Sequence, residues 1–402
     1  MAEALTENTK CLACGSEELE RILDLGKQPL ANNYETEHTA STEYPLAVNL
    51  CTNCYHLQLT HTVDPGIIYT DYLYRTGTNQ TIKNYSEWFA RWVTERMGKE
   101  EYSVLDVGCN DGTQLDSFNK QTTYGIDPAA NLAEFRNSKH QCVTGFFSEN
   151  AIQELGVLSF DVINNQNAFS HLADPMDFLR IARRHLIPEG RIYLSTSQAN
   201  MVLNNEFDTI YHEHISFYNA YSMYKLARRA GLHLTDVVKT PIHGTSYVFE
   251  LRHEAVNQEH VKNILAVEAA HGLQTKDTYF TWSENVQALC KELVALINLK
   301  AYEGIKVVGY GAAAKGNTLL NYTQVPLACI IDDSPLKQGL YTPGRHIPII
   351  SADQLADYVD PTQCVYMPLA WNFFEEIRTR LQTHLNTPVE FIRYFPKVGV
   401  VN

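Results

Sequence analysis

The chain has 402 residues, more than a single hydrophobic core usually serves, so we expect about two or three domains. Hydrophobic residues make up 45% and charged residues 19%, which excludes a disordered chain, and no apolar run approaches the roughly 20 residues that a membrane-spanning helix requires. The net charge of −14 disfavours nucleic acid as a partner, although a local basic pocket can still bind a nucleotide-sized ligand.

The first residues, MAEALTENTK, lack the basic stretch and the apolar core of a secretory signal. The nine cysteines are an odd number with four of them in close pairs, which fits a reducing compartment. We therefore expect a soluble, cytoplasmic protein that does not associate with membranes. Its oligomeric state stays open, with a monomer favoured.

Two CxxC pairs stand near the N-terminus, Cys11 with Cys14 and Cys51 with Cys54. Each pair can hold one edge of a tetrahedral metal ion, and the long interval between the pairs closes a loop. A redox pair or unrelated buried cysteines would not explain two matching pairs. The spacing therefore predicts a zinc site, and four protein ligands leave no open position, so this zinc should be structural.

After the cysteines the hydrophobic pattern becomes helical and then alternates. From about Thr78 to Met97, apolar residues recur at spacings of three and four, which predicts an amphipathic helix. Strand-like runs then alternate with helical patterns, as in a parallel doubly wound sheet. A proline-free stretch from about Asn257 to Tyr302 is predicted to be helical, and a second α/β pattern follows it. The predicted strands are Ser103–Val107, Thr123–Ile126, Phe160–Asn164, Arg191–Ser195, Lys306–Gly309 and Ala328–Asp332.

A glycine turn at residues 108–112 directly follows the strand that ends at Val107, and the next strand leads to Asp127. An acid about 20 residues after such a turn commonly binds the ribose hydroxyls of an adenosine cofactor. The layout suits NAD or S-adenosylmethionine, but Asn110 and Thr113 stand where a dinucleotide fingerprint has its second and third glycines. S-adenosylmethionine has no phosphate that must approach the turn, so it is the better fit.

The densest polar cluster, residues 207–214, ends in Tyr211, His212, Glu213 and His214. A Glu–His pair can remove a proton next to a carbonyl, and a tyrosine hydroxyl or a neutral imidazole can stabilise the resulting enolate oxygen. An enolate is the carbon nucleophile that methyl transfer to carbon requires. The histidines are two positions apart instead of four, so we do not expect zinc-protease chemistry.

A second glycine-rich turn, GYGAAA at residues 309–314, follows a predicted strand, and Asp332 ends the next one. This matches G-x-G-x-x-A with a distal acid and, taken by itself, indicates a dinucleotide. It supports the alternative function, an NAD-dependent oxidoreductase or epimerase of nucleotide sugars.

The chain resembles the zinc-containing sugar C-methyltransferases that act on TDP-linked or otherwise nucleotide-activated 4-keto-deoxysugars, and the resemblance covers nearly its whole length. The matching runs are CLACG, CTNCYHLQL, DYLYRTG, VLDVGCNDGTQL, TGFFSE, NNQNAFSHLADP, FDTIYHEHISFY, PIHGTSYVFEL, GYGAAAKGNTLLNY and IDDSPLKQGLYTPGRHIPI.

The resemblance implies an α/β multidomain enzyme of three parts. We expect a small zinc-binding module at residues 1–75 and a class I S-adenosylmethionine-dependent methyltransferase domain with its leading helix at 76–256. A helical linker and a Rossmann-like domain that binds the sugar nucleotide would then occupy residues 257–402.

The resemblance also implies the reaction. A base removes the proton at C-3 of the 4-keto sugar, and the enolate carbon attacks the methyl group of S-adenosylmethionine. His214 would be the base with Glu213 assisting it, and His171 with a nearby tyrosine would hold the keto oxygen. The residues that match the family's catalytic positions are His214, Glu213, Tyr211, His171 and either Tyr72 or Tyr74.

Binding residues carry over in the same way. The cofactor set is Asp106, Gly108, Asn110, Gly112, Asp127, Phe146, Phe147, Ser148, Gln166 and Asn167. The substrate set is Lys315, Asn317, Lys337, Tyr341, Arg345 and His243. Near His243 the chain departs from the family, because Thr245 stands where relatives have a second glycine, and this leaves the identity of the sugar open.

Overall fold

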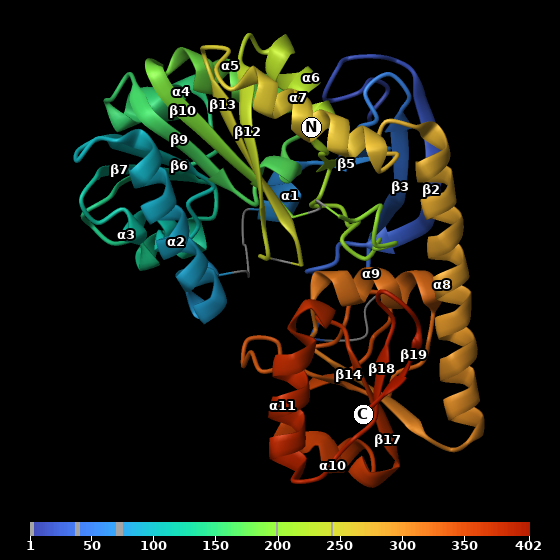
Figure 1. Ribbon diagram of the computed structural model, residues 1–402. Helices are drawn as coiled ribbons and strands as arrows, with labels where there is room; N and C mark the ends of the chain where they lie inside the picture. The colour runs from blue at the N-terminus through green and yellow to red at the C-terminus, as the bar shows by residue number, and fades with distance from the viewer. Residues whose placement is uncertain (1–3, 37–40, 70–74, 198–199, 243) are drawn as a thin grey trace. The chain divides into compact units, whose positions relative to one another are not determined.

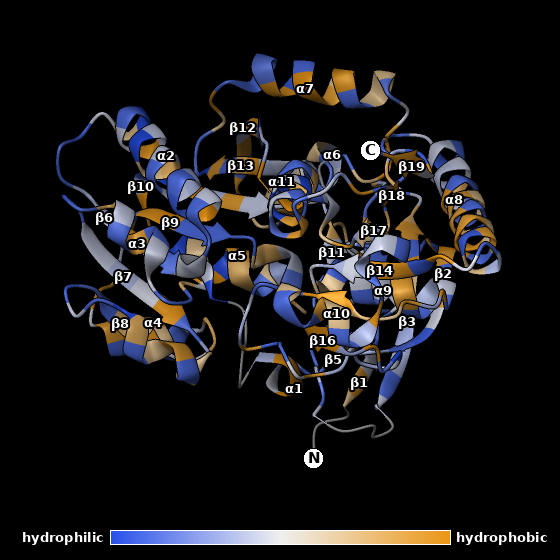
Figure 2. Cartoon of the chain, turned by 90° about the horizontal axis from the view of Figure 1, so that it is seen from below, coloured by the Kyte–Doolittle hydropathy of each residue, from blue (hydrophilic) through white to orange (hydrophobic). Residues whose placement is uncertain are grey.

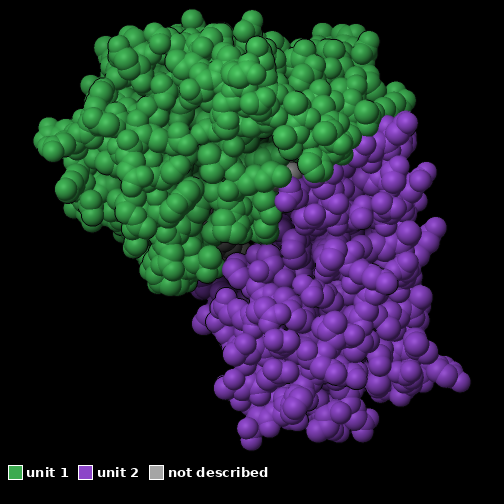
Figure 3. Space-filling view, viewed as in Figure 1, with its two compact units in different colours: residues 1–20, 49–199, 215–276 green, residues 21–48, 200–214, 277–402 purple. Residues whose placement is uncertain are grey.

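The computed structural model describes residues 4–36, 41–69, 75–197, 200–242 and 244–402 (Figure 1). The chain forms two compact units, coloured separately in Figure 3, and each is assembled from segments far apart in the sequence. Unit 1 comprises Met1–Glu20, Asn49–Ala199 and Ile215–Lys276. Unit 2 comprises Arg21–Val48, Asn200–His214 and Asp277–Asn402.

Unit 1 is built on a seven-stranded sheet with the order β12-β13-β10-β9-β6-β7-β8 (Figure 1). Strands β6 to β10 pair in parallel, whereas β13 pairs antiparallel with both β10 and β12. The bounds are β6 Ser103–Val107, β7 Thr122–Asp127, β8 Gln141–Thr144, β9 Phe160–Gln166, β10 Leu186–Thr196, β12 His233–Thr240 and β13 Ser246–Arg252.

The predicted doubly wound α/β arrangement of this part of the chain is confirmed, and every strand predicted for it is present. The pattern did not indicate the antiparallel hairpin of β12 and β13. Only a short connection separates Thr240 from Ser246, and a short connection can join antiparallel strands but not parallel ones.

Helix α2, Gln80–Met97, confirms the predicted amphipathic helix. The side chain of Asn79 caps its N-terminus by accepting from the backbone N–H groups of Thr81 and Ile82. Its apolar face, which includes the fully buried Phe89 and Val93, belongs to a core shared with the central strands. The other helices of unit 1 are α1 Pro65–Tyr69, α3 Thr113–Ser117, α4 Glu149–Leu155, α5 Pro175–Arg184, α6 Ala220–Arg229 and α7 Gln258–Ala270.

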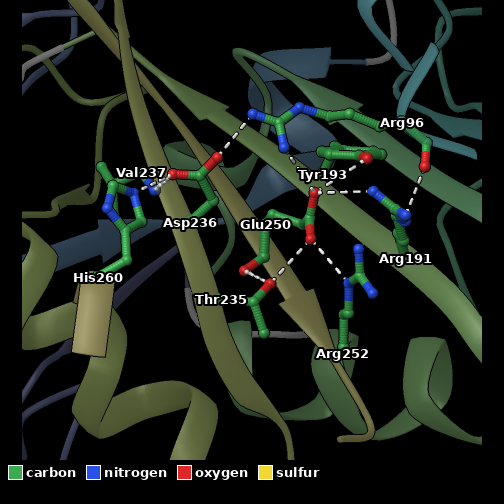
Figure 4. A network of polar contacts seen from close by, with 9 residues as sticks. All are labelled: Arg96, Arg191, Tyr193, Thr235, Asp236, Val237, Glu250, Arg252 and His260. Atoms are coloured by element: carbon green, nitrogen blue, oxygen red, sulfur yellow. Dashed lines mark hydrogen bonds and ion pairs between the residues drawn. The ribbon is translucent and has the colours of Figure 1, made fainter. Parts of the chain in front are cut away.

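A buried carboxylate ties the hairpin to the parallel part of the sheet (Figure 4). Glu250 of β13, 1% exposed, accepts hydrogen bonds from Thr235 at 2.9 Å, from Arg252 at 2.7 Å and from Tyr193 at 3.1 Å, and Arg191 lies 3.4 Å away. A buried charge persists only when it is paired and hydrogen-bonded. The other members of the network are Arg96, Asp236, Val237 and His260.

Unit 2 contains a six-stranded sheet with the order β16-β15-β14-β17-β18-β19, parallel except for the last strand. Its core includes Val308, Ile331, Tyr366, Leu381 and Phe391. The strands are β14 Lys306–Tyr310, β15 Ile330–Ile331, β16 Ile349–Ile350, β17 Cys364–Pro368, β18 Phe391–Arg393 and β19 Gly399–Val401. The helices are α8 Lys276–Tyr302, α9 Ala314–Thr323, α10 Leu355–Tyr358 and α11 Phe374–Leu385. The predicted second Rossmann-like fold is thereby confirmed.

The stretch from Asn257 to Tyr302 that the sequence predicts to be helical consists of two helices, α7 and α8. Gly272 adopts a left-handed conformation with φ of 78° between them, which an α-helix cannot accommodate. Along α8, hydrophobic and hydrophilic residues alternate in Figure 2, and its buried members include Trp282, Val286 and Leu293. Helix α8 is therefore amphipathic.

The N-terminal segment contributes the strands of two further sheets. A four-stranded sheet has the order β11-β4-β3-β2, and β1 pairs antiparallel with β5. The bounds are β1 Leu5–Glu7, β2 Leu19–Pro29, β3 Glu43–Cys51, β4 Leu57–Leu59, β5 His61–Val63 and β11 Ser216–Phe217. Within the described residues, no helix has both the length and the apolar character needed to cross a membrane.

The sulfur atoms of Cys11, Cys14, Cys51 and Cys54 all lie within 4.8 Å of one another. Cys11 is 3.5 Å from Cys54, and Cys14 is 3.5 Å from Cys51. In a tetrahedral zinc thiolate, Zn–S bonds of about 2.3 Å place neighbouring sulfurs about 3.8 Å apart. The amide of Asn53 also donates to the sulfur of Cys14 at 3.6 Å. These cysteines therefore fit a structural zinc ion in number, chemistry and spacing.

Removing one ligand should unfold this module. We expect Cys51→Ser to lose zinc and to make residues 1 to about 75 sensitive to protease, because three remaining ligands hold zinc weakly and the buried Cys51 belongs to the local core. Mass spectrometry of bound zinc and limited proteolysis measure both effects. Cys364→Ser, a half-buried cysteine outside the cluster, is the control and should keep its zinc. Full zinc in Cys51→Ser would contradict the assignment.

Candidate functional site

Unit 1 carries the glycine turn between β6 and α3. Gly108 and Gly112 have φ of 80° and 84°, and Asn110 also lies in the left-handed region with φ of 51°. A Cβ atom at Gly108 would lie 2.9 Å from the Cβ of Ala168, so a larger residue would fill this space. Packing against Ala168 thus requires a glycine at position 108, and the mostly buried turn lies at the carboxyl ends of the strands, where ligands of such sheets bind.

Asp127 ends β7 beside this turn and is buried. Its carboxylate accepts hydrogen bonds from the backbone N–H groups of Asn110 and Ala129, both at 2.8 Å, and Arg136 lies 3.5 Å away. Burial raises the pKa of Asp127, and the two backbone hydrogen bonds oppose that rise. Each carboxylate oxygen has a second lone pair, so Asp127 can still accept from ribose hydroxyls.

A chain of buried hydrogen bonds fixes the end of β9. Asn164 donates to Asp106 at 2.9 Å, Gln166 donates to Asn164 at 2.5 Å, and Tyr85 donates to Gln166 at 3.0 Å. Burial, followed by the charge of Asp127, raises the pKa of Asp106 well above its usual range. The predicted cofactor residues Asp106 and Gln166 are therefore connected through Asn164, which the sequence did not single out.

The remaining predicted cofactor residues differ in exposure. Phe146 is 52% exposed, and the neighbouring Gly145 N–H donates to the backbone carbonyl of Asp127 at 3.0 Å. Phe147 packs on Phe178 with ring centroids 4.8 Å apart, so its ring belongs to the core. Ser148 caps α4. Asn167, with φ of 58°, donates its N–H to Ser195 at 3.1 Å. Phe146 therefore offers the exposed aromatic face of this group.

His171 closes the short 3-10 helix Phe169–His171 of unit 1. Its ring stacks on Tyr69, with centroids 5.7 Å apart and an interplanar angle of 11°. Burial lowers the pKa of His171 to about 4, so the imidazole is neutral near pH 7. A neutral imidazole can donate one hydrogen bond to a developing oxyanion.

Unit 2 carries the polar cluster. Nδ1 of His214 lies 2.8 Å from the carbonyl oxygen of Thr209, which can only accept, so Nδ1 carries the hydrogen of the neutral ring. Nε2 therefore has the lone pair, and the hydroxyl of Tyr211 donates to it at 2.9 Å. The structure brings these two predicted catalytic residues together as a base with an adjacent phenol.

The other two residues of the cluster are tied to distant segments of unit 2. Glu213, 5% exposed, accepts a hydrogen bond from the amide of Asn32 at 2.5 Å. His212, 2% exposed, donates from Nε2 to the carbonyl oxygen of Tyr44 at 3.2 Å, and its Nδ1 meets no partner among the described residues. Burial lowers the pKa of His212 to about 4. His212 is therefore a neutral anchor of the loop.

Asp208 anchors the start of the same loop and is fully buried. Its Oδ2 accepts from the indole N–H of Trp371 at 2.8 Å and from the hydroxyl of Tyr394 at 3.4 Å. Burial raises the pKa of Asp208 to about 6, and the charge of Lys315 opposes that rise. Thr318 donates to the backbone carbonyl of Ile210 at 3.1 Å. Thr318 from the first half of the Rossmann-like domain, and Trp371 and Tyr394 from its second half, thus form hydrogen bonds that hold the loop of residues 206–214 in place.

Two predicted substrate residues of unit 2 contact the glycine-rich turn and a segment near the N-terminus. Asn317, 1% exposed, donates to the carbonyl oxygen of Ala31 at 2.6 Å. Lys337 donates to the carbonyl oxygen of Ala312 at 2.6 Å and lies 5.2 Å from the ring centroid of Tyr34. The side chain of Asn317 is therefore directed at protein, whereas Lys337 stands beside the turn.

The remaining substrate residues are less closely grouped. Tyr341 forms an isolated β-bridge with Glu35. Lys315 lies in the first turn of α9, 4.9 Å from the ring of Trp371, while Arg345 bonds Gln324 at the opposite end of that helix. The structure does not bring Arg345 to the N-terminal end of α9. Tyr72, Tyr74 and His243 lie outside the described residues.

The sequence missed Asn32 and Tyr34, which contact the polar cluster and the glycine-rich turn. Tyr34 donates its hydroxyl to the carbonyl oxygen of Ala312 at 2.6 Å. Burial raises the pKa of Tyr34, and the charges of Asp332 and Glu213 add to that rise. The available signal was the run LANNYE, whose polar residues directly follow the strand Leu19–Pro29.

The buried neutral imidazole of His212 predicts acid sensitivity. Its pKa is about 4 in the folded chain against about 6.5 in an unfolded one, so between these values only the unfolded state binds the proton. Folding stability should therefore fall as the pH falls from 7 to 5, by about 2 kcal/mol for this residue. Urea unfolding at both pH values should show a smaller fall for His212→Gln than for the native chain. Equal falls would contradict this account.

Three family models match successive parts of the chain. They are described as "Putative zinc binding domain" at residues 11–69, "Methyltransferase domain" at residues 80–237 and "C-methyltransferase C-terminal domain" at residues 241–396.

Individual proteins resemble the chain over different lengths. The C-methyltransferase NovU of Streptomyces niveus is 28% identical over 98% of this chain and 97% of its own length. A ubiquinone biosynthesis O-methyltransferase of Pseudomonas aeruginosa strain LESB58 is 30% identical, but over 27% of this chain and 50% of its own. The solved 1,6-didemethyltoxoflavin-N1-methyltransferase of Burkholderia thailandensis aligns with 44% of this chain and 81% of its own at 18% identity and a TM-score of 0.34.

The zinc-binding cysteines, the methyltransferase sheet and the C-terminal domain stand in one order along the chain, and the likeness to a C-methyltransferase extends over nearly all of it. The chain is an S-adenosylmethionine-dependent methyltransferase that is similar to zinc-containing C-methyltransferases along nearly its whole length.

Proposed function

We propose that this enzyme methylates C-3 of a nucleotide-activated 4-keto-deoxysugar through an enolate, with TDP as the expected nucleotide. The observation that carries the proposal is the Tyr211–His214 pair, in which a buried imidazole keeps its Nε2 lone pair directed at a phenol. Carbon becomes a nucleophile at neutral pH when a base removes a proton beside a carbonyl and an acid holds the oxygen. A base and an acid in direct contact suit this step.

In the proposed reaction, Nε2 of His214 takes the C-3 proton, which requires that substrate displace the Tyr211 hydroxyl from it. That hydroxyl then donates to the oxygen of the enolate, whose negative charge it stabilises. The oxyanion-binding role that the resemblance implies for His171 is kept as a proposal. Glu213 assists His214. Bound S-adenosylmethionine supplies the electrophilic methyl group that the enolate carbon accepts.

We propose that the cofactor residues of the sequence prediction hold S-adenosylmethionine in unit 1. The Asp127 carboxylate accepts from the ribose hydroxyls, and the left-handed turn at Gly108 and Gly112 faces the amino acid part. Phe146 faces the adenine, whereas Phe147 supports it from the core. Asp106, Asn110, Ser148, Gln166 and Asn167 complete this set.

For the sugar nucleotide, we propose that the second glycine-rich turn and Lys315, Asn317, Lys337, Tyr341 and Arg345 provide the diphosphate-binding region, with His243 near the sugar. The cationic Lys337 beside the turn and the N-terminal end of α9 both favour an anion. We also propose the division into domains at residues 1–75, 76–256 and 257–402. The family models agree with the first boundary, since they match residues 11–69 and 80–237, but they place the second one between residues 237 and 241.

The direct test is to incubate the enzyme with S-adenosylmethionine and a panel of 4-keto sugar nucleotides, and to detect a product heavier by one methylene group. We expect a new carbon–carbon bond at C-3 by NMR, because the keto group acidifies the hydrogens of C-3 and C-5 and the proposed base acts at C-3. Matched nucleotides with a hydroxyl in place of the 4-keto group should not react. Methylation of oxygen, or of the hydroxyl sugars, would overturn the proposal.

The assignment of the base has its own test. Exchange of the C-3 proton with deuterated water measures enolate formation, and His214→Ala should slow it by about 100-fold or more, the usual size of a general-base contribution. His212→Gln is the matched control, because a glutamine amide can also donate to the Tyr44 carbonyl oxygen, and it should exchange near the native rate. Native exchange in His214→Ala would reject His214 as the base.

A further inference from the structure

Glu213 of the polar cluster is bound by a residue 181 positions away in the chain. The Nδ2 atom of Asn32 lies 2.5 Å from Oε1 of Glu213, and both residues belong to unit 2. Asparagine carries no ionisable group, so its N–H donates whatever the protonation state of its neighbour. A histidine or a second acid at this place would instead compete with Glu213 for the proton.

The segment that carries Asn32 is itself fixed on both sides. Before it, the carbonyl oxygen of Ala31 accepts from Asn317 at 2.6 Å. After it, the hydroxyl of Tyr34 donates to the carbonyl oxygen of Ala312 at 2.6 Å. Asn32 therefore approaches Glu213 from a segment held against α9 and the glycine-rich turn, and its amide has little freedom to follow a displaced carboxylate.

The neighbouring residues of the loop are also held by hydrogen bonds. His214 is bound through Nδ1 to Thr209, and Tyr211 is bound to His214. Glu213 lies between them in sequence, and the amide of Asn32 contacts its carboxylate from outside the loop. An angstrom of displacement at such a group can cost about 100-fold in rate.

We propose that Asn32 is a positioning residue of the methyl transfer, which acts by holding the carboxylate of Glu213 in place for its work with His214. The proposal rests on the function proposed above. Asn32 does not need to touch the substrate, and Tyr34 supports it by fixing the segment on the Ala312 carbonyl oxygen.

Asn32→Asp is the sharpest test, because it keeps the shape and replaces the donor by an acid. Two carboxyl groups at 2.5 Å cannot both be ionised in contact, so they share a proton or move apart. We expect kcat to fall by about 100-fold with the KM for S-adenosylmethionine unchanged. The acid limb of the kcat profile should also move upward by about one pH unit or more.

Asn32→Ala removes the donor without adding a charge, so kcat should fall by about tenfold with no movement of the acid limb. Asn33→Asp is the matched control, since this exposed neighbour makes the same change of charge one residue away. It should keep the native kcat and pH profile. Thermal unfolding of each variant shows whether the fold is kept. If Asn32→Asp fails to fold, the fall in kcat of Asn32→Ala tests the proposal instead.

The outcomes separate this proposal from the function on which it rests. A native enzyme that neither exchanges the C-3 proton nor methylates any 4-keto sugar nucleotide would refute the function. A native enzyme that does both, together with an Asn32→Asp variant that behaves as Asn33→Asp does, would refute the role of Asn32. A fall in kcat without movement of the acid limb in Asn32→Asp would reduce Asn32 to a purely structural residue and would also overturn the proposal.

Discussion

The hydrogen bond from Nδ1 of His214 to the carbonyl oxygen of Thr209 decides what the polar loop can do. It fixes the tautomer, and the tautomer places the lone pair on Nε2, where the hydroxyl of Tyr211 meets it. The carbonyl of Thr209 belongs to the same short loop as His214. The local fold of the loop therefore determines which ring nitrogen of His214, the proposed base, keeps its lone pair. Everything else in this part of unit 2 serves to keep that loop in one conformation.

Burying such a loop costs free energy, because each of its polar groups loses water. The cost is offset where a partner replaces that water, as Trp371 does for Asp208, Tyr44 for His212 and Asn32 for Glu213. Each partner comes from a different part of the sequence. The loop is therefore stable only in the complete unit, and its chemistry depends on segments that do not themselves react.

The strongest features could be predicted from the sequence because their signals are local. Two CxxC pairs indicate a metal site, and a strand that runs into a glycine turn indicates a cofactor site, whatever surrounds them. The partners of the loop could not be predicted, since nothing local relates Asn32 to a glutamate 181 positions away. Phe147 shows a similar limit: its type fits an adenine pocket, but its ring packs on Phe178.

The glycine-rich turn of the C-terminal domain resembles the turn of unit 1 for a structural reason. In unit 1, Asp127 accepts from the N–H of Asn110, and Arg136 donates to the carbonyl oxygen of that same turn residue at 2.8 Å.

In unit 2, Asp332 accepts from the N–H of Ala312 at 2.7 Å, and Lys337 donates to the carbonyl oxygen of Ala312. The two turns thus use one internal arrangement, an acid on the amide and a cation on the carbonyl. The glycines and the distal acid are needed to build the turn. Their spacing therefore predicts the conformation of the turn and does not identify the ligand. What distinguishes the second turn is Tyr34, whose hydroxyl shares the Ala312 carbonyl oxygen and comes from a segment that no fingerprint includes.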